Sequence, residues 1–198
     1  MQPHTIVFIG PQGSGKGTQV RNITGYLESL GTGPVVNIET GKAFRSLAET
    51  ASYTAARVKE LLADGQMIPN FIAKAFIVKF LIKNLTPETH LTMDGFPRNV
   101  TQVQFLDDLM TFYKRGTLSV VYLDAPIELV KERLLARGRN DDIPELIEER
   151  LRLYQKDTAP VVEVYKARND VNFIHIDATK SIEAIQQDIM AGLERISG

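Results

Sequence analysis

The stretch GPQGSGKGTQ, at residues 10–19, decides the fold of this chain. It follows an apolar run at residues 5–9 and precedes a helical pattern that ends near residue 30. This order predicts a strand, a glycine-rich loop and the start of a helix. Glycines let such a loop curl until its backbone N–H groups point at an anion, with the positive end of the helix behind them.

The spacing of glycines and lysine in this loop fits the P-loop pattern, in which Lys16 carries a mobile charge to the β and γ phosphates. Gly17 stands where a hydroxyl is usual, so Thr18 is the nearest side chain that offers an oxygen. We therefore expect magnesium to be held largely through water. The alternative is a flexible glycine turn without a ligand, which the strand before it and the helix after it disfavour.

Length and composition limit the classes of protein to consider. The chain has 198 residues, 43% of them hydrophobic, which suits one substantial core in a single domain at 1–198. A net charge of -1 gives no general attraction to nucleic acid or to a membrane surface. Cysteine is absent, which excludes disulfides, thiolate zinc sites and thiol catalysis.

No signal-peptide pattern or membrane-spanning segment is found in the sequence. The most apolar stretch, residues 71–85, contains Lys74, Lys79 and Lys83. We expect it to form a buried helix, because it is too short and too charged to cross a bilayer. The sequence therefore predicts a soluble cytoplasmic protein.

The rest of the chain alternates between strand and helix patterns. Strands are expected at 35–38, 91–93, 118–123 and 173–177, with helical periodicity between them. Because parallel strands need crossover helices, we predict an α/β fold of the P-loop type, with a five-stranded, parallel, doubly wound sheet and helices on both faces. Ligands in such sheets bind beyond the carboxyl ends of the strands.

Local signals predict where several helices begin or bend. Thr40 and Asn70 are expected to cap the helices that follow them. Gly31 and Gly138 are placed to end helices. Pro160 is expected to kink or divide the helical region that opens near residue 144.

A carboxylate and a set of arginines accompany the glycine loop. Asp94 ends a predicted strand, the usual position for an acid that holds magnesium through water beside a P-loop. The alternative for Asp94 is a cap of a turn or helix. The notable arginines, several of which lie at the ends of elements rather than on exposed faces, are Arg45, Arg98, Arg133, Arg137, Arg139 and Arg150.

With these motifs the chain resembles an adenylate kinase of the nucleoside monophosphate kinase family. The resemblance extends over essentially the whole length. The matching segments are GPQGSGKGTQ at 10–19, ETGKAFR at 39–45, DGFPRNVTQ at 94–102, ERLLARGRNDD at 132–142 and IEERLRLYQKDTAPVVEVY at 147–165. The resemblance implies reversible transfer of the γ-phosphoryl group of MgATP to AMP, giving two ADP.

The resemblance also implies a role for individual residues. Those of the ATP site would be Gly13, Ser14, Gly15, Lys16, Gly17, Thr18, Arg133, Arg137 and Lys180. Those of the AMP site would be Thr40, Arg45, Gly95, Arg98, Gln102, Arg139 and Arg150. The catalytic residues would be Lys16, Arg98, Arg139 and Arg150, with Asp94 holding magnesium through water.

Two mobile parts are implied as well, because water must be kept from the transferring group. One is an excursion at 40–69 that covers AMP, and the other is a very short lid at 136–143 that covers ATP and has no zinc ligands. The expected partners are ATP and AMP, without nucleic acid or membrane. We expect the chain to act as a monomer.

Base choice depends on Thr40 and Gln102, which match family positions that favour adenine as the acceptor base. The pyrimidine monophosphate kinases of the family carry Ala and Asn there. A glutamine amide offers a donor and an acceptor side by side, which suits N6 of adenine and the neighbouring ring nitrogen. The alternative for Gln102 is a solvated helix residue.

The sequence departs from the family pattern at a few positions. Lys42 stands where the family usually has an acid associated with the magnesium waters, and Gln12 and Gln66 replace commoner residues. The alternatives to adenylate kinase are therefore a UMP/CMP kinase, or a weakly catalytic nucleotide-binding or sensor protein. A GTPase is disfavoured because no N-K-x-D element for guanine is present.

Overall fold

The computed structural model describes residues 2–139 and 141–195, in which strands and helices alternate. The elements are, in chain order, β1 (Thr5–Ile9), α1 (Lys16–Ser29), β2 (Val35–Glu39), α2 (Thr40–Ala48), α3 (Tyr53–Ala63), α4 (Asn70–Asn84), β3 (His90–Asp94), α5 (Val100–Phe112), β4 (Leu118–Asp124), α6 (Ile127–Arg137), α7 (Pro144–Leu153), a π-helical turn η1 (Tyr154–Thr158), α8 (Ala159–Lys166), β5 (Val171–Asp177) and α9 (Ile182–Glu194).

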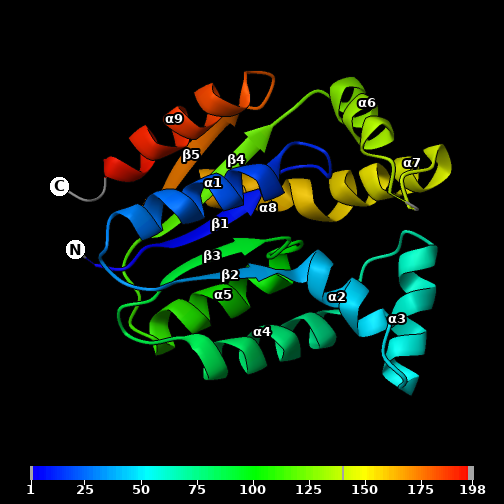
Figure 1. Ribbon diagram of the computed structural model, residues 1–198, viewed down its shortest axis with the longest axis horizontal. Helices are drawn as coiled ribbons and strands as arrows, with labels where there is room; N and C mark the ends of the chain where they lie inside the picture. The colour runs from blue at the N-terminus through cyan, green and yellow to red at the C-terminus, as the bar shows by residue number, and fades with distance from the viewer. Residues whose placement is uncertain (1, 140, 196–198) are drawn as a thin grey trace.

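The sheet is parallel throughout, with the order β2-β3-β1-β4-β5 (Figure 1). β1 lies in the centre, and Phe8 is in register with Asp94 on one side and with Val121 on the other. Parallel strands connected by helices place all five carboxyl ends at one edge. The predicted five-stranded P-loop fold is therefore confirmed.

Each face of the sheet has its own hydrophobic core. Ile6 and Phe8 of β1 belong to a cluster with residues of α1, α6, α7 and α9. Val7 and Ile9 belong to a second cluster with residues of α4, α5 and α8. Every residue of β1 is buried, as expected for a central strand that helices cover on both sides. The loop that follows β1 is thus attached to a fully buried strand.

Two predicted helix caps are wrong. Glu39, not Thr40, is the N-cap of α2, and the Thr40 hydroxyl instead donates to the backbone oxygen of Gly95 at 2.9 Å. Pro69, not Asn70, is the N-cap of α4. The Asn70 side-chain oxygen instead accepts hydrogen bonds from the side chains of Asn99 and Gln102, at the start of α5. In both cases the side chain that was expected to cap the helix forms hydrogen bonds with residues that are distant in the sequence.

The helix α4 is buried along one face, and its other face is exposed. Ala73, Ile77 and Leu81 pack into the core, whereas Phe71 and Ile82 are largely exposed. Within the described residues, no helix is long and apolar enough to cross a membrane. The expected division near Pro160 takes the form of the π-helical turn η1, which ends just before α8.

Candidate active site

The glycine loop forms a closed turn between β1 and α1. The Lys16 ammonium group folds back over it and donates to the backbone oxygens of Gly10 and Pro11, at 2.8 and 2.7 Å. Gly13 has a φ of +89°, and a Cβ there would lie 2.9 Å from the Val130 backbone oxygen in α6. A side chain at this position would therefore force the loop away from α6. Within the turn the Ser14 N–H donates to the Pro11 backbone oxygen at 3.1 Å and the Thr18 N–H to the Gly15 backbone oxygen at 3.0 Å, which holds the loop curled.

Lys16 is the positive charge at the centre of this loop. Burial lowers its pKa to about 8; Asp94 opposes the shift, and Arg98 and Arg137 add to it by repulsion. Within the described residues Lys16 forms no ion pair. A buried ammonium group without a carboxylate partner is costly, and an entering phosphate would supply the missing negative charge.

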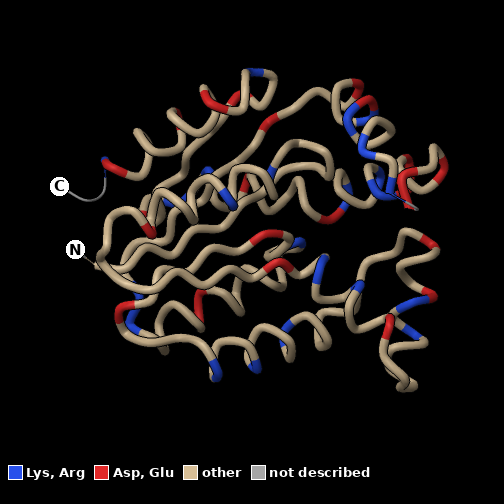
Figure 2. The backbone as a smooth tube through the Cα atoms, in the orientation of Figure 1, with Lys and Arg blue, Asp and Glu red and all other residues tan. Residues whose placement is uncertain are grey.

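A cleft with a volume of about 410 Å³ opens in front of the loop, at the carboxyl edge of the sheet. The predicted site residues that line it are Gly13, Gly15, Lys16, Gly17, Thr18, Arg45, Asp94, Gly95, Arg98, Gln102, Arg133, Arg137, Arg139 and Arg150. Figure 2 shows basic segments on both sides of this edge, on α6 and α7 and on α2 and α3. The structure thus gathers residues from distant parts of the sequence.

Three predicted site residues do not line this cleft. Ser14 and Thr40 are each almost completely buried. The Ser14 hydroxyl lies against Gly10 inside the loop, and the Thr40 hydroxyl lies against Gly95. Lys180 lines a second cavity of about 760 Å³ between β5 and α9, and its ammonium group pairs with Asp188 at 2.7 Å. Arg133 lies between the two regions, since it lines the cleft and donates to the Ala178 backbone oxygen at 3.0 Å.

On one side of the cleft, Arg98 is held by the turn after β3. Its Nε donates to the Gly95 backbone oxygen at 2.9 Å, and its Nη1 lies 3.9 Å from the Met67 sulfur. Gln102 accepts from the Arg98 backbone N–H at 2.6 Å and donates to Asn70 at 2.7 Å. Gln102 is 2% exposed, so its interpretation as a solvated helix residue is wrong.

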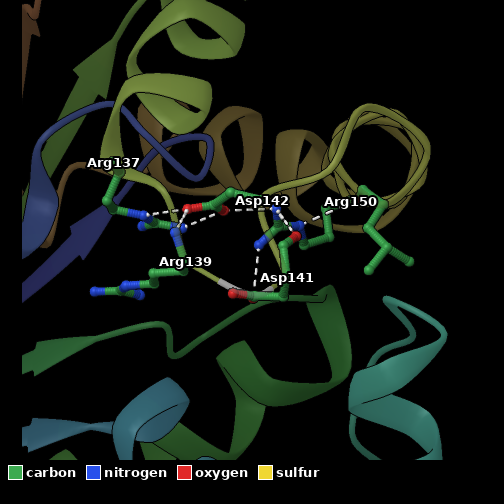
Figure 3. Close-up of polar contacts among 6 residues, drawn as sticks. Arg137, Arg139, Asp141, Asp142 and Arg150 are labelled. Carbon is green, nitrogen blue, oxygen red and sulfur yellow. Dashed lines mark hydrogen bonds and ion pairs between the residues drawn. The ribbon is translucent and has the colours of Figure 1, made fainter.

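On the other side, two aspartates organise the arginines between α6 and α7 (Figure 3). Arg137 donates to both carboxylate oxygens of Asp142, at 2.8 and 2.7 Å. Arg150 contacts Asp142 at 3.0 Å and Asp141 at 3.0 Å. The backbone N–H of Arg139 also donates to Asp142, while its guanidinium group points away from that carboxylate (Figure 3). Asp142 thereby fixes the loop and leaves Arg139 free to reach into the cleft.

The charges of the two sides act on one another. Burial lowers the pKa of Arg98, and repulsion from Arg45 and Arg150 lowers it further, against the attraction of Asp94. Burial likewise lowers the pKa of Arg139, with repulsion from Arg137 and Arg45. Mutual repulsion of this kind requires the guanidinium groups to converge. An anion with several negative charges would relieve it.

Sequence reasoning missed several residues at this site. Asp141 and Asp142 directly follow the arginine-rich segment, and two consecutive acids beside several arginines are a signal that could have found them. Gln66, which the sequence shows only as a departure from the family pattern, lies after α3 and donates to Glu149 of α7 at 2.8 Å. Asn140, inside the predicted lid at 136–143, lies outside the described residues.

The metal expected here would depend on few protein ligands. Within residues 2–139 and 141–195, no group of three or more His, Cys, Asp or Glu side chains could hold a metal ion. Asp94 lies next to the start of α1, where its Oδ2 would be 3.8 Å from a Cβ at Gly17. Magnesium keeps several waters and combines one or two carboxylates with phosphate oxygens, so this donor set fits a nucleotide-bound magnesium ion.

A glycine loop between a central strand and a helix, at the carboxyl edge of a parallel sheet and facing converging arginines, defines a P-loop phosphotransferase. The family model described as Adenylate kinase matches residues 8–170. The chain therefore belongs to the adenylate kinase family, and it is a nucleoside monophosphate kinase.

Individual relatives agree over almost the entire chain. It is 35% identical over 188 residues to an adenylate kinase of Synechococcus sp. (strain WH7803), with 95% of this chain and 97% of that protein covered. It is 33% identical over 184 residues to adenylate kinase 1 of Synechocystis sp., at 93% and 94% coverage. It is 31% identical over 188 residues to adenylate kinase 1 of Nostoc sp., at 95% and 97% coverage. These names do not favour the UMP/CMP kinase alternative.

Proposed function

We propose that the chain transfers the γ-phosphoryl group of MgATP reversibly to AMP, giving two ADP. The observation that carries this proposal is that Lys16, Arg98 and Arg137 line one cleft at the end of β1. They lie close enough for Arg98 and Arg137 to lower the pKa of Lys16 by repulsion. The phosphates of two nucleotides would neutralise these cations. The AMP phosphate is an ionised nucleophile, so positioning and charge stabilisation suffice without a general base.

In this proposal the donor nucleotide occupies the glycine loop. Backbone N–H groups of 13–18 bind its phosphates, with Lys16 on the β and γ groups and Arg137 beside them. Arg133 covers the base, which extends toward the backbone near Lys180. The contact of Arg133 with the Ala178 oxygen supports this direction, because it connects the cleft to the segment that precedes Lys180.

The acceptor occupies the opposite side of the cleft. Arg45 and Arg98 bind the AMP phosphate, and Gln102 recognises the adenine base, while Thr40 acts from behind the cleft by holding the Gly95 backbone oxygen at 2.9 Å. The burial of Gln102 and its contact with the Arg98 backbone support a link between base recognition and phosphate placement. Arg139 and Arg150 stabilise the charge that spreads over the transferring group.

Magnesium is the expected ion, with Asp94 as the residue that holds its waters. When bound, the ion neutralises charge on the phosphate oxygens of ATP. The excursion at 40–69 and the lid at 136–143 then exclude water from the cleft. Arginine suits the lid, since its planar fork pairs with two phosphate oxygens at once.

A coupled assay with ATP and one of four acceptors, AMP, CMP, UMP or GMP, tests this function. We expect turnover with AMP to exceed the other acceptors by at least about tenfold, since Arg98 and Asn70 fix the Gln102 amide in one orientation and its remaining donor and acceptor match the edge of adenine. Fast turnover of UMP or CMP with none of AMP would contradict the base assignment.

The weakly catalytic alternative is motivated by Lys42, which lines the cleft where an acid is expected. The variant Lys42→Asp separates the two possibilities. A rate that changes less than about threefold indicates an enzyme that manages its metal without that acid. A gain of about a hundredfold would instead indicate a wild-type protein that binds nucleotide with little catalysis.

A further inference from the structure

Two carboxylates stand side by side at the carboxyl edge of the sheet. Glu39 is the last residue of β2 and Asp94 the last residue of β3, and the two are register partners in the parallel pair. Both line the cleft. Register partners on neighbouring strands project their side chains to the same face of a sheet. The two carboxylates therefore share a face.

That face is the one that carries the glycine loop. Asp94 is in register with Phe8, which belongs to the core beneath α1. Its Oδ2 lies 3.8 Å from the position of a Cβ on Gly17, at the start of α1. Because Glu39 lies beside Asp94 on this face, its carboxylate also faces the place where the phosphates of ATP are expected.

The strand positions one step behind the carboxylates are polar as well. Asn37 and Thr92 are register partners on the same face, two residues before Glu39 and Asp94. Thr92 is fully buried, and within the described residues neither its Oγ1 nor the Asn37 Oδ1 has a hydrogen-bond partner. Asn37 Nδ2 donates to Glu39 at 3.3 Å. Unpaired buried oxygens of this kind are satisfied by ordered water in native proteins, and here they lie directly behind the two carboxylates.

Lys16 and Arg98 attract Asp94 electrostatically, but neither forms an ion pair with it. Within residues 2–139 and 141–195, neither Glu39 nor Asp94 forms an ion pair with a lysine or arginine. Lys42 lines the same cleft three residues after Glu39, yet it forms no ion pair with that carboxylate either. Like charges directly opposite each other on neighbouring strands are destabilising unless a cation lies close to both.

We propose that Glu39 is a second magnesium-positioning residue, which, beside Asp94, holds water molecules of the magnesium ion that ATP carries. This proposal rests on the function proposed above. It also bears on Lys42, which stands where the family resemblance leads one to expect an acid. In this chain the acid Glu39 lies immediately before Thr40 and Gly41 instead of after them.

The test measures metal binding directly and needs no turnover. Mn²⁺ serves as the probe, and its free concentration is followed by electron paramagnetic resonance in the presence of the protein and a non-hydrolysable ATP analogue. We expect Glu39→Gln to weaken Mn²⁺ binding to the protein–analogue complex about tenfold, which is the usual loss when an outer-shell group of a metal site is removed. Metal-free analogue should bind Glu39→Gln at least as tightly as it binds the wild type.

Matched variants separate this role from a structural one. Glu49→Gln removes the same charge from the exposed far end of α2 and should leave Mn²⁺ binding unchanged. Glu39→Asp should keep most of the affinity, and thermal melting of each variant reports whether it is folded. Asp94→Asn should weaken binding at least as much as Glu39→Gln.

Wild-type Mn²⁺ affinity in Glu39→Gln, with weakened binding in Asp94→Asn, would overturn the proposal and leave the proposed function intact. Equal losses in Glu39→Gln and Glu49→Gln would also overturn it, because they would indicate a general effect of charge. A wild-type protein that fails to bind the analogue would contradict the proposed function itself, and this proposal with it.

Discussion

The two cationic regions of the cleft are built in different ways. The glycine loop before α1 is short and continuous, and its one lysine contacts only backbone oxygens, those of Gly10 and Pro11. The region between α6 and α7 holds its arginines through carboxylates, with Asp142 contacting both Arg137 and Arg150. One region leaves its charge unpaired, and the other pairs the charges of Arg137 and Arg150 within the protein.

The difference shows how each region meets a phosphate. Lys16 has lost water without gaining an ion-pair partner, so an anion that enters the loop interacts with a charge that is already desolvated. Arg137 and Arg150 are already paired, so their gain from a phosphate is smaller, and Asp142 serves to hold their geometry. We therefore expect mutations in the loop to remove binding and those in the α6–α7 region to disturb positioning.

The largest effect is expected from Lys16→Met, which removes the unpaired charge and keeps most of the side-chain length. The turnover number should fall about a thousandfold, as when a charged donor to a transition state is lost. The free energy of unfolding should not fall, because a buried charge is removed. Steady-state kinetics and thermal melting check both statements. A fall in the turnover number of less than about tenfold would contradict the expectation that the unpaired lysine matters more than the paired arginines.

The next effect is expected from Asp142→Asn, which cancels the charge that Arg137 and Arg150 share. Burial raises the pKa of Asp142, but hydrogen bonds from Arg137 and Arg150 outweigh burial and hold that pKa at about 2. The variant should lose about 1–3 kcal/mol of stability, the usual result when a buried charged group loses its partner. The turnover number should fall about tenfold, with the KM for ATP changed less.

Its matched control is Asp141→Asn, since the Asp141 side chain is 37% exposed and, among the described residues, forms its ion pair with Arg150 alone. That variant should lose clearly less stability. The wild type has a further signature in acid, because a carboxylate with a depressed folded-state pKa stabilises the fold above its unfolded value near 4. This contribution should disappear as the pH falls toward 2, and it should be missing in Asp142→Asn. Equal acid sensitivity of both proteins would contradict the assignment.

The contrast also explains what the sequence could predict. The glycine loop is local, so strand, loop and helix follow from residues 5–30, and the parallel sheet follows from the alternation of patterns. Asp142 was missed because its role depends on tertiary structure. The turn between α6 and α7 places its carboxylate in contact with both Arg137 and Arg150. Thr40 was assigned a cap for a similar reason, since the carbonyl that accepts its hydroxyl proton lies across the sheet edge, on Gly95.

A third effect concerns pH and tests the loop alone. The pKa of Lys16 lies at about 8 in the free protein, so its charge is lost as the pH rises through that value. ATP binds the charged form, and its affinity should therefore fall above pH 8, by at most about tenfold for each pH unit. Calorimetric titrations between pH 7.5 and about pH 9.5 measure this. Lys16→Met should bind weakly at every pH, and a parallel decline in that variant would assign the titration to another group.

The smallest effect is expected where the excursion at 40–69 meets α7, at the hydrogen bond from Gln66 to Glu149. This contact is exposed, and Glu149 is also held by Arg152 of the same helix, so its loss should hardly change stability. It does connect the excursion at 40–69 with α7, which also carries Arg150. If opening of these segments limits turnover, Gln66→Ala should raise the turnover number about twofold and raise the KM for AMP.

Arg152→Gln supplies the control for Gln66→Ala, because it frees Glu149 from its own helix and leaves the contact between the segments in place. Its turnover number should match that of the wild type. A gain in both variants would indicate that the charge of Glu149, and not the bridge, sets the rate. A gain confined to Gln66→Ala would mean that the hydrogen bond between the excursion at 40–69 and α7 limits the rate, while the ion pairs of Arg150 only hold that residue in position.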